Sequence, residues 1–380
     1  MIIARLRGSG MVKKLIASIL FLIILTSLVS GCKSDNYEME TTVFSDMIFS
    51  VSLNGKNAVK AGREMEQIVG QIDKAISLSK NDSELTRLNN ASEGERVEIS
   101  KTVYELIVLS KDLYKKTKGA FNVAVSKISE LWNVDINGIT KYCYGEQTPP
   151  PFPTQQELEN QKATTNLDTV LVEEINEKYY VTRTDKNVKL DFGGIAKGYI
   201  CDRLKNIAKD YGITSGMISL SGNLMFLGIN QKKQSEWSVG ITNPRRTTLT
   251  QPQHIMAFYT SECSVVTSGD YERYYEKDGV RINHVIDGRT LMPVGVERIS
   301  NDSYKNSDSY VVSCTIVGDS SAYADALATA VMVLGVDEGQ KMIAELGYKG
   351  VIFTSDKKYS MVGEIKLIES ETHYKTYTKL

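Results

Sequence analysis

Residues 189–199 read Lys189-Leu190-Asp191-Phe192-Gly193-Gly194-Ile195-Ala196-Lys197-Gly198-Tyr199, an apolar, strand-like start that passes through two glycines into a helical pattern. A glycine lets another group approach the backbone closely because it has no Cβ. The first turn of a helix offers unpaired N–H groups that attract anions, and Lys197 adds a positive charge there. The segment is therefore a candidate phosphate cradle, while an ordinary strand-to-helix turn stays open as the alternative.

Two better-known phosphate motifs do not fit this segment. Asp191-Phe192-Gly193 spells the DFG of protein kinases, but the HRD motif and the glycine-rich loop of kinases are missing from the chain. The GxxxxGK[ST] spacing of a P-loop is also absent from the segment. Kinase and P-loop chemistry are therefore excluded here.

Outward from this segment, apolar residues recur at helical spacing, with short β-branched runs between them. The predicted helices cover residues 58–75, 103–114, 195–211, 323–334 and 337–346. The predicted strands cover residues 43–53, 170–172, 179–182, 188–192, 217–220, 238–241, 311–317 and 351–354. A proline cluster at 148–154 indicates a surface excursion that could separate two lobes. The pattern has no internal repeat and predicts an α+β class, with one large mixed α/β domain over residues 43–380.

Composition narrows the function. The chain has 380 residues, 42% of them hydrophobic, which is enough for a sizeable core. Its formal charge of -1 gives no basic field for nucleic acid, so we expect no such partner. Outside the N-terminal segment, the cysteines show neither CxxC spacing nor histidine partners, so neither a zinc site nor a redox pair is predicted: Cys143, Cys201, Cys263 and Cys314.

The N-terminus reads as an export signal. Basic residues, among them Lys13 and Lys14, precede an apolar run over 15–29. The run ends Val29-Ser30-Gly31-Cys32, which resembles the lipobox at which bacterial lipoproteins are cut and lipidated. We expect a signal peptide over 1–31, a lipidated Cys32 with a polar tether over 32–42, and an exported domain anchored to the bacterial cell membrane. A plain signal anchor with an incidental cysteine is the alternative.

Two further motifs could carry chemistry. Asp325 and Thr329 are four apart on a predicted helix, so their oxygens share one face and suit a hard cation such as Mg²⁺; a structural Asp and a Thr bonded to its own helix are the commoner situation. His284 lies among turn-forming and charged residues and could act as a general base near neutral pH, or be structural. A Ser268 nucleophile with His284 as its base is also conceivable.

The order of the motifs along the chain is more specific than any one of them. From about Val43 to the C-terminus it resembles the FAD:protein FMN transferase (ApbE) family. The motifs that carry the resemblance are Asn81 to Asn89, Gly119 to Val123, Leu131-Trp132, Leu190 to Gly198, Ser221-Gly222-Asn223, Val239 to Pro244, Thr267 to Asp270, His284 to Asp287 and Ala324 to Thr329.

The resemblance implies an activity. Members of the family resemble the predicted α+β domain, bind flavin between two sub-lobes, use Mg²⁺, and move FMN from FAD to a Thr or Ser of a partner protein with release of AMP. This chain has no segment like the acceptor motif that the family modifies, so we expect a separate acceptor, such as a membrane-associated electron carrier. Two rivals stay open: metal-dependent hydrolysis of FAD to FMN and AMP, and a non-catalytic solute-binding lipoprotein.

The resemblance also assigns roles to residues, all of them expectations. Asp191 and Lys197 would contact FAD, and His284 would be the base. The nucleotide would further contact Ala120, Phe121, Asn122 and Ile286, and the metal would be held by the Gly194 carbonyl, Asp325 and Thr329. The chain departs from the family pattern at three places: Ser45-Asp46-Met47, Ser79, and Asp287 to Thr290.

Overall fold

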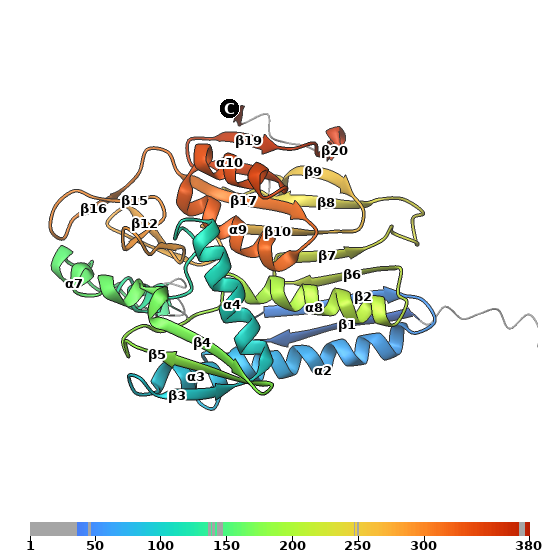
Figure 1. Ribbon diagram of the computed structural model, residues 1–380. Coiled ribbons are helices and arrows are strands. Elements are labelled where there is room, and N and C mark those ends of the chain that lie inside the picture. The colour runs from blue at the N-terminus through green and yellow to red at the C-terminus, as the bar shows by residue number, and fades with distance from the viewer. Residues whose placement is uncertain are drawn as a thin grey trace, which may run out of the picture.

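The computed structural model describes residues 36–380 apart from 45–46, 136–137, 139–140, 143–146, 247, 249–250 and 372–376 (Figure 1). The predicted signal peptide, Cys32 and Cys143 lie outside these residues. Within the described part, no helix is both long and apolar enough to cross a bilayer.

A nine-stranded sheet forms the centre of the molecule (Figure 1). Its neighbours are antiparallel except for the last pair, which is parallel. In spatial order its strands are β1 (Asn36–Val43), β2 (Met47–Asn54), β6 (Ser215–Leu220), β7 (Asn223–Leu227), β10 (Cys263–Gly269), β17 (Val311–Gly318), β18 (Lys349–Thr354), β19 (Lys358–Val362) and β21 (Thr378–Lys379). The predicted α+β class is confirmed.

Helices cover one face of this sheet, and a small sheet covers the other (Figure 1). The helices predicted from apolar spacing are all present, as α2 (Ala58–Ile76), α4 (Lys101–Lys116), α8 (Ala196–Asp210), α9 (Ser321–Leu334) and α10 (Val336–Glu345). On the opposite face, β8 (Trp237–Thr242), β9 (His254–Thr260) and β20 (Lys366–Leu367) form the small sheet. Val239 and Phe258 of that sheet pack with Val265 and Phe353 of the large one, so the large sheet is buried on both faces where the small sheet covers it.

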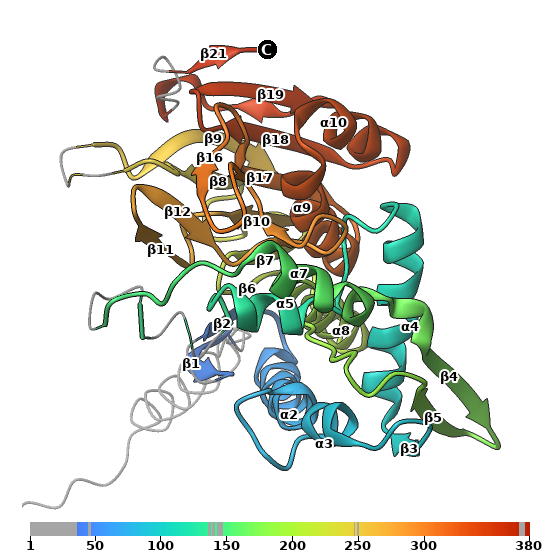
Figure 2. The same cartoon turned by 90° about the vertical axis from the view of Figure 1, so that its left-hand side faces the viewer.

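Two smaller units flank this core. The first is a sheet of β3 (Arg96–Ile99), β5 (Lys178–Arg183) and β4 (Val170–Ile175). The second, which faces the viewer in Figure 2, is a lobe around Trp132 and Tyr304. Its elements are α5 (Ser126–Leu131), α7 (Gln155–Asn160), and the hairpins β11 (Tyr274–Lys277) with β12 (Val280–Asn283), β13 (Ile286–Asp287) with β14 (Met292–Pro293) and β15 (Val296–Arg298) with β16 (Tyr304–Asn306).

Three local predictions need correction. The tether expected over 32–42 is wrong from Asn36 on, because residues 36–43 form β1 and alternate between exposed and partly buried positions at the sheet edge. The proline cluster is partly packed, since the Phe152 ring packs against Trp132 and the Pro153 carbonyl accepts a hydrogen bond from the Tyr304 hydroxyl. Residues 188–192 form no strand, for a reason that matters at the site.

Candidate active site

The glycine-rich segment is held by side chains rather than by a sheet. The Asn89 amide, at the end of α3 (Glu84–Asn90), donates to the Leu190 carbonyl at 2.8 Å and accepts from the Leu190 N–H at 2.9 Å. The Asp191 N–H donates to the Val123 carbonyl at 2.8 Å. Asp191 Oδ1 accepts from the Gly193 N–H at 2.8 Å, which tightens the turn. The segment is therefore extended but bonded at single points, and it leads directly into α8.

Gly198 brings α8 and α9 into close contact. A Cβ at this position would lie 2.2 Å from the Ser321 carbonyl oxygen, which no larger residue could tolerate without moving the helices apart. This approach places the Asp325 carboxylate on the start of α8. Its Oδ2 accepts from the Gly198 N–H at 3.0 Å, and its Oδ1 lies 3.3 Å from Lys197 Nζ.

Three of the predicted ligand and phosphate residues surround this carboxylate. Thr329, one turn further along α9, has its Oγ1 3.3 Å from the Asp325 carbonyl and 3.4 Å from Ser268 Oγ. A Cβ on Gly194 would lie 3.5 Å from the same Thr329 Oγ1. Gly194, Lys197, Asp325 and Thr329 are thus brought together from two stretches that lie more than a hundred residues apart.

This group offers hard oxygen atoms for a cation. Asp325 is only 1% exposed and accepts two donors, which leaves lone pairs on both oxygens. Among the residues that the structure describes, no three His, Cys, Asp or Glu side chains gather in a way that could hold a metal ion. A cation here would therefore depend on one carboxylate, a hydroxyl and a carbonyl, with other ligands from phosphate or water. That set fits Mg²⁺, which commonly binds through few protein ligands.

A cavity of about 320 Å³ opens beside the glycine turn. Asp191, Gly193 and Lys197 line it, and so do Arg273 and His284 from the small lobe. The residues at and after the end of α2, the start of β2, and α5 also line it, with Met47 and Ser79 among these residues. Met47 and Ser79 belong to two of the places where the chain departs from the family pattern, so those departures alter the cavity wall itself.

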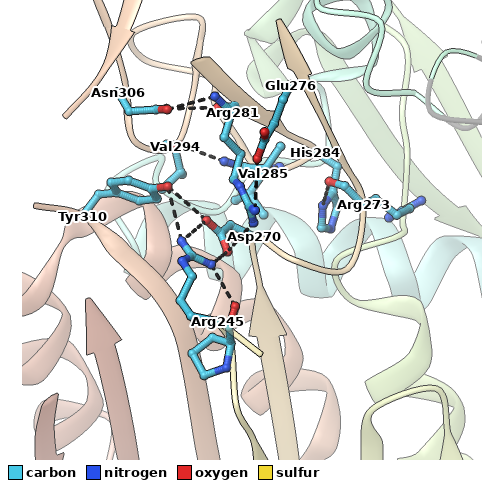
Figure 3. Close-up of polar contacts among 12 residues, drawn as sticks. Arg245, Asp270, Arg273, Glu276, Arg281, His284, Val285, Val294, Asn306 and Tyr310 are labelled. Atoms are coloured by element: carbon cyan, nitrogen blue, oxygen red, sulfur yellow. Dashed lines mark hydrogen bonds and ion pairs between the residues drawn. The ribbon is translucent and has the colours of Figure 1, made fainter. Parts of the chain in front are cut away.

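His284 projects into this cavity directly after β12 (Figure 3). Its Nδ1 lies 3.1 Å from the Arg273 carbonyl oxygen, which can only accept, so Nδ1 carries the proton and Nε2 is left as the basic atom. Burial of the ring lowers the pKa of His284 well below its usual range, and the positive charges of Arg273 and Lys197 lower it further. His284 is thus neutral at pH 7, with Nε2 unprotonated.

Four of the predicted nucleotide contacts are not among the residues lining this cavity. Phe121 is buried and packs against Gly194, and Ala120 is buried beside it. The Asn122 amide bonds to the Thr165 carbonyl and the Ala124 N–H. Ile286 is packed in the core of the small lobe, with Trp132 in the same cluster. Their roles as flavin contacts remain predictions.

The structure weakens one alternative and adds one residue. Ser268 Oγ contacts Thr329, whereas the His284 ring contacts a backbone carbonyl, so a Ser268–His284 nucleophile pair is not formed. Arg273 was not predicted as a site residue, yet it lines the cavity together with His284. The only sequence pattern that could have indicated Arg273 is the charged stretch Asp-Tyr-Glu-Arg that contains it. That stretch is equally typical of a solvent-exposed run of charged residues.

Comparisons with known proteins point to one family. A sequence profile described as the ApbE family matches residues 39–352. The FAD:protein FMN transferase of Treponema pallidum is 28% identical over 308 residues, which cover 78% of this chain and 77% of that protein. The one from Escherichia coli K12 is 26% identical over 311 residues, which cover 80% of each chain.

Solved structures share the fold. The flavin transferase ApbE from Vibrio cholerae superimposes with a TM-score of 0.69 at 21% identity, covering 87% of this chain and 98% of that one. The ApbE protein of Thermotoga maritima gives a TM-score of 0.68 at 25% identity, with coverage of 88% and 98%.

Proposed function

The chain belongs to the ApbE family, and on that premise we propose that it transfers FMN from FAD to a hydroxyl of another protein and releases AMP. The observation that carries this proposal is the meeting of Asp325 with the Lys197 end of α8, beside the cavity that holds His284. A phosphate-binding turn, an oxygen-rich cation site and a base are the parts that transfer of a phosphoryl-type group needs.

The reaction breaks one bond of the FAD pyrophosphate and forms one phosphoester. The acceptor hydroxyl oxygen attacks the FMN phosphorus, and AMP departs with the bridging oxygen. His284 Nε2 takes the hydroxyl proton, which Nδ1 cannot do because it already carries one. Lys197 and Arg273 supply positive charge near the phosphates.

We assign a Mg²⁺ site to Asp325, Thr329 and the Gly194 carbonyl. A cation bound there would neutralise pyrophosphate charge and stabilise the departing AMP. Lys197, 3.3 Å from Asp325, supports the same assignment, because its positive charge would attract phosphate oxygens to the carboxylate.

We also propose that the protein is exported and held at the bacterial membrane by a lipid on Cys32. The basic, apolar and lipobox-like order of residues 1–32 supports this. The acceptor would then be a membrane-associated electron carrier on the same side of the membrane, bearing a Thr or Ser in the family's acceptor motif.

The test is to incubate the enzyme with FAD, Mg²⁺ and a candidate acceptor and to measure the acceptor's mass. Transfer predicts a mass increase equal to FMN minus water, with one AMP released per adduct. Free FMN and AMP without an adduct would make the protein an FAD hydrolase. Tight FAD binding with no AMP under any condition would make it a non-catalytic flavin-binding protein.

A further inference from the structure

A fully buried carboxylate lies at the base of the β11–β12 hairpin (Figure 3). Asp270 is 0% exposed, and each of its oxygens accepts an Arg245 guanidinium N–H at 2.7 Å. The Tyr310 hydroxyl donates to Oδ2 at 3.1 Å, and Arg281 lies 3.9 Å from Oδ1. Bidentate arginine–carboxylate hydrogen bonds of this kind fix the relative orientation of the two side chains as well as the distance between them.

These contacts meet the hairpin at the segment that leads into β11 and on β12. Asp270 directly follows β10 and comes just before β11, and its backbone N–H donates to the Val312 carbonyl at 3.0 Å. Arg281 belongs to β12 and stacks over the Tyr274 ring of β11 at 3.7 Å. Arg245 comes from a separate segment, after β8. The hairpin is therefore fastened to the large sheet at its root.

His284 is bonded to the segment that follows this root. The Arg273 carbonyl accepts from the His284 N–H at 3.2 Å and from Nδ1 at 3.1 Å. Just before it, the buried Asn283 amide donates to the Val294 carbonyl at 2.7 Å and accepts from the Val285 N–H at 3.0 Å. Arg273 lies three residues after Asp270, so whatever moves Asp270 moves the carbonyl that orients the imidazole.

We propose that Arg245 and Asp270 are positioning residues for His284: their ion pair holds the hairpin so that the imidazole keeps Nδ1 on Arg273 and turns Nε2 toward the cavity. A buried ion pair contributes little net stability once its desolvation is counted, so a role in fixing geometry accounts for it better than a role in holding the fold. The inference rests on the proposed transfer only for its kinetic test.

Arg245→Lys is the main test, because lysine keeps the charge but cannot make the two-pronged contact. We expect kcat for FMN transfer to fall by about 10–10²-fold, with KM for FAD unchanged, because misplacement of a base affects the reaction and not FAD binding. NMR of ¹⁵N-histidine protein without FAD gives the second readout. The sequence has three histidines, so His284 can be assigned with single variants. Wild type should show a pure Nδ1–H form of His284, and the variant a mixture of forms.

Two further variants keep the result interpretable. Arg203→Lys makes the same change in an arginine–carboxylate contact on α8, with Glu105 3.5 Å away, and should leave both readouts unchanged. Tyr310→Phe removes one neutral hydrogen-bond donor from Asp270. It should change kcat and the His284 spectrum in the same direction as Arg245→Lys, but less. It replaces Arg245→Lys as the test if that variant does not fold.

An unchanged His284 spectrum and unchanged kcat in folded Arg245→Lys, or in Tyr310→Phe if Arg245→Lys does not fold, would overturn the proposal. If wild type fails to transfer FMN but its His284 signals still respond to Arg245→Lys, then the proposed function fails and the positioning role survives.

Discussion

Two buried aspartates in this molecule have opposite surroundings. Asp270 has both oxygens bonded to Arg245 at 2.7 Å and a tyrosine hydroxyl in addition. Asp325 accepts one backbone N–H at 3.0 Å and one lysine at 3.3 Å. Asp270 therefore has little capacity left for a ligand, whereas Asp325 keeps lone pairs for one. Burial alone does not identify a functional carboxylate; the unfilled bonding capacity does.

The largest expected effect is on the base that the Asp270 region holds. His284→Ala should lower kcat for transfer by about 10²–10⁴-fold while FAD still binds, because a general base contributes to the reaction and not to affinity. Steady-state kinetics and FAD titration would measure this. His254→Ala, at an exposed position on β9, is the control. Normal turnover in His284→Ala would remove the residue from the mechanism.

Asp270→Asn should cost about 3–5 kcal/mol of unfolding free energy, since it leaves the Arg245 charge without its buried partner. Chemical denaturation would measure the loss. The same substitution at Asp325 should cost clearly less, because Asp325 has one lysine contact at 3.3 Å where Asp270 has two arginine bonds at 2.7 Å. Equal losses at both positions would break the distinction between the two carboxylates.

Asp325→Asn should instead lower transfer by about 10²–10³-fold, a size typical of losing one electrostatic contact to the transition state. The dependence of the rate on Mg²⁺ concentration should weaken or disappear with it. Assays over a range of Mg²⁺ would measure both. If the variant keeps the wild-type rate and Mg²⁺ response, Asp325 does not hold the metal.

Gly198→Ala tests the helix contact that positions Asp325. The new Cβ would meet the Ser321 carbonyl, so the two helices must separate. We expect this to lower the free energy of unfolding by about 1–3 kcal/mol. Thermal unfolding should show the loss. Gly70→Ala, in α2, has open space and should raise stability slightly, by about 0.5–1 kcal/mol. A Gly198→Ala protein as stable as wild type would show that the contact is loose.

The pH dependence of transfer is the smallest expected effect. The folded-state pKa of His284 lies below its unfolded value of about 6.5, so acidification protonates the unfolded chain first. The contribution of His284 to the free energy of unfolding is therefore complete above a pH of about 6.5 and is lost as the pH falls below that value. The acid limb of kcat should also lie below pH 6.5. A limb at or above 6.5, or one unchanged in His284→Gln, would contradict this assignment.

Periodicity predicted the helices because each one buries a single apolar stripe, as α2 does with Ala61, Met65 and Ile72. It failed at residues 188–192, where β-branched and apolar residues suggested a strand. The Leu190 backbone is bonded by the Asn89 side chain, and no local pattern encodes a partner that distant. The short α3, α5 and α7 were missed because six or seven residues carry too little periodicity.

At the site, motif spacing identified the glycine turn, Asp325, Thr329 and His284, while it could not show that they meet. Their meeting depends on how closely Gly198 lets two helices approach, which is a tertiary property. Arg273 was missed for a similar reason. Its backbone carbonyl orients the imidazole. Every residue type has a backbone carbonyl, so the residue type at this position does not indicate the role.

If a lipid on Cys32 anchors the protein as proposed, the first strand would set the height of the reaction above the membrane. Asn36 pairs with Asn54 at the end of the sheet away from the cavity, and β1 runs eight residues, about 25 Å, toward Phe44 and Met47 in the cavity wall. Only residues 33–35 separate Cys32 from Asn36, a reach of about 14 Å at most. With a lipid on Cys32, this short linker would hold the end of the sheet that lies away from the cavity near the bilayer. The acceptor would then have to lift its hydroxyl well clear of the headgroups to be modified.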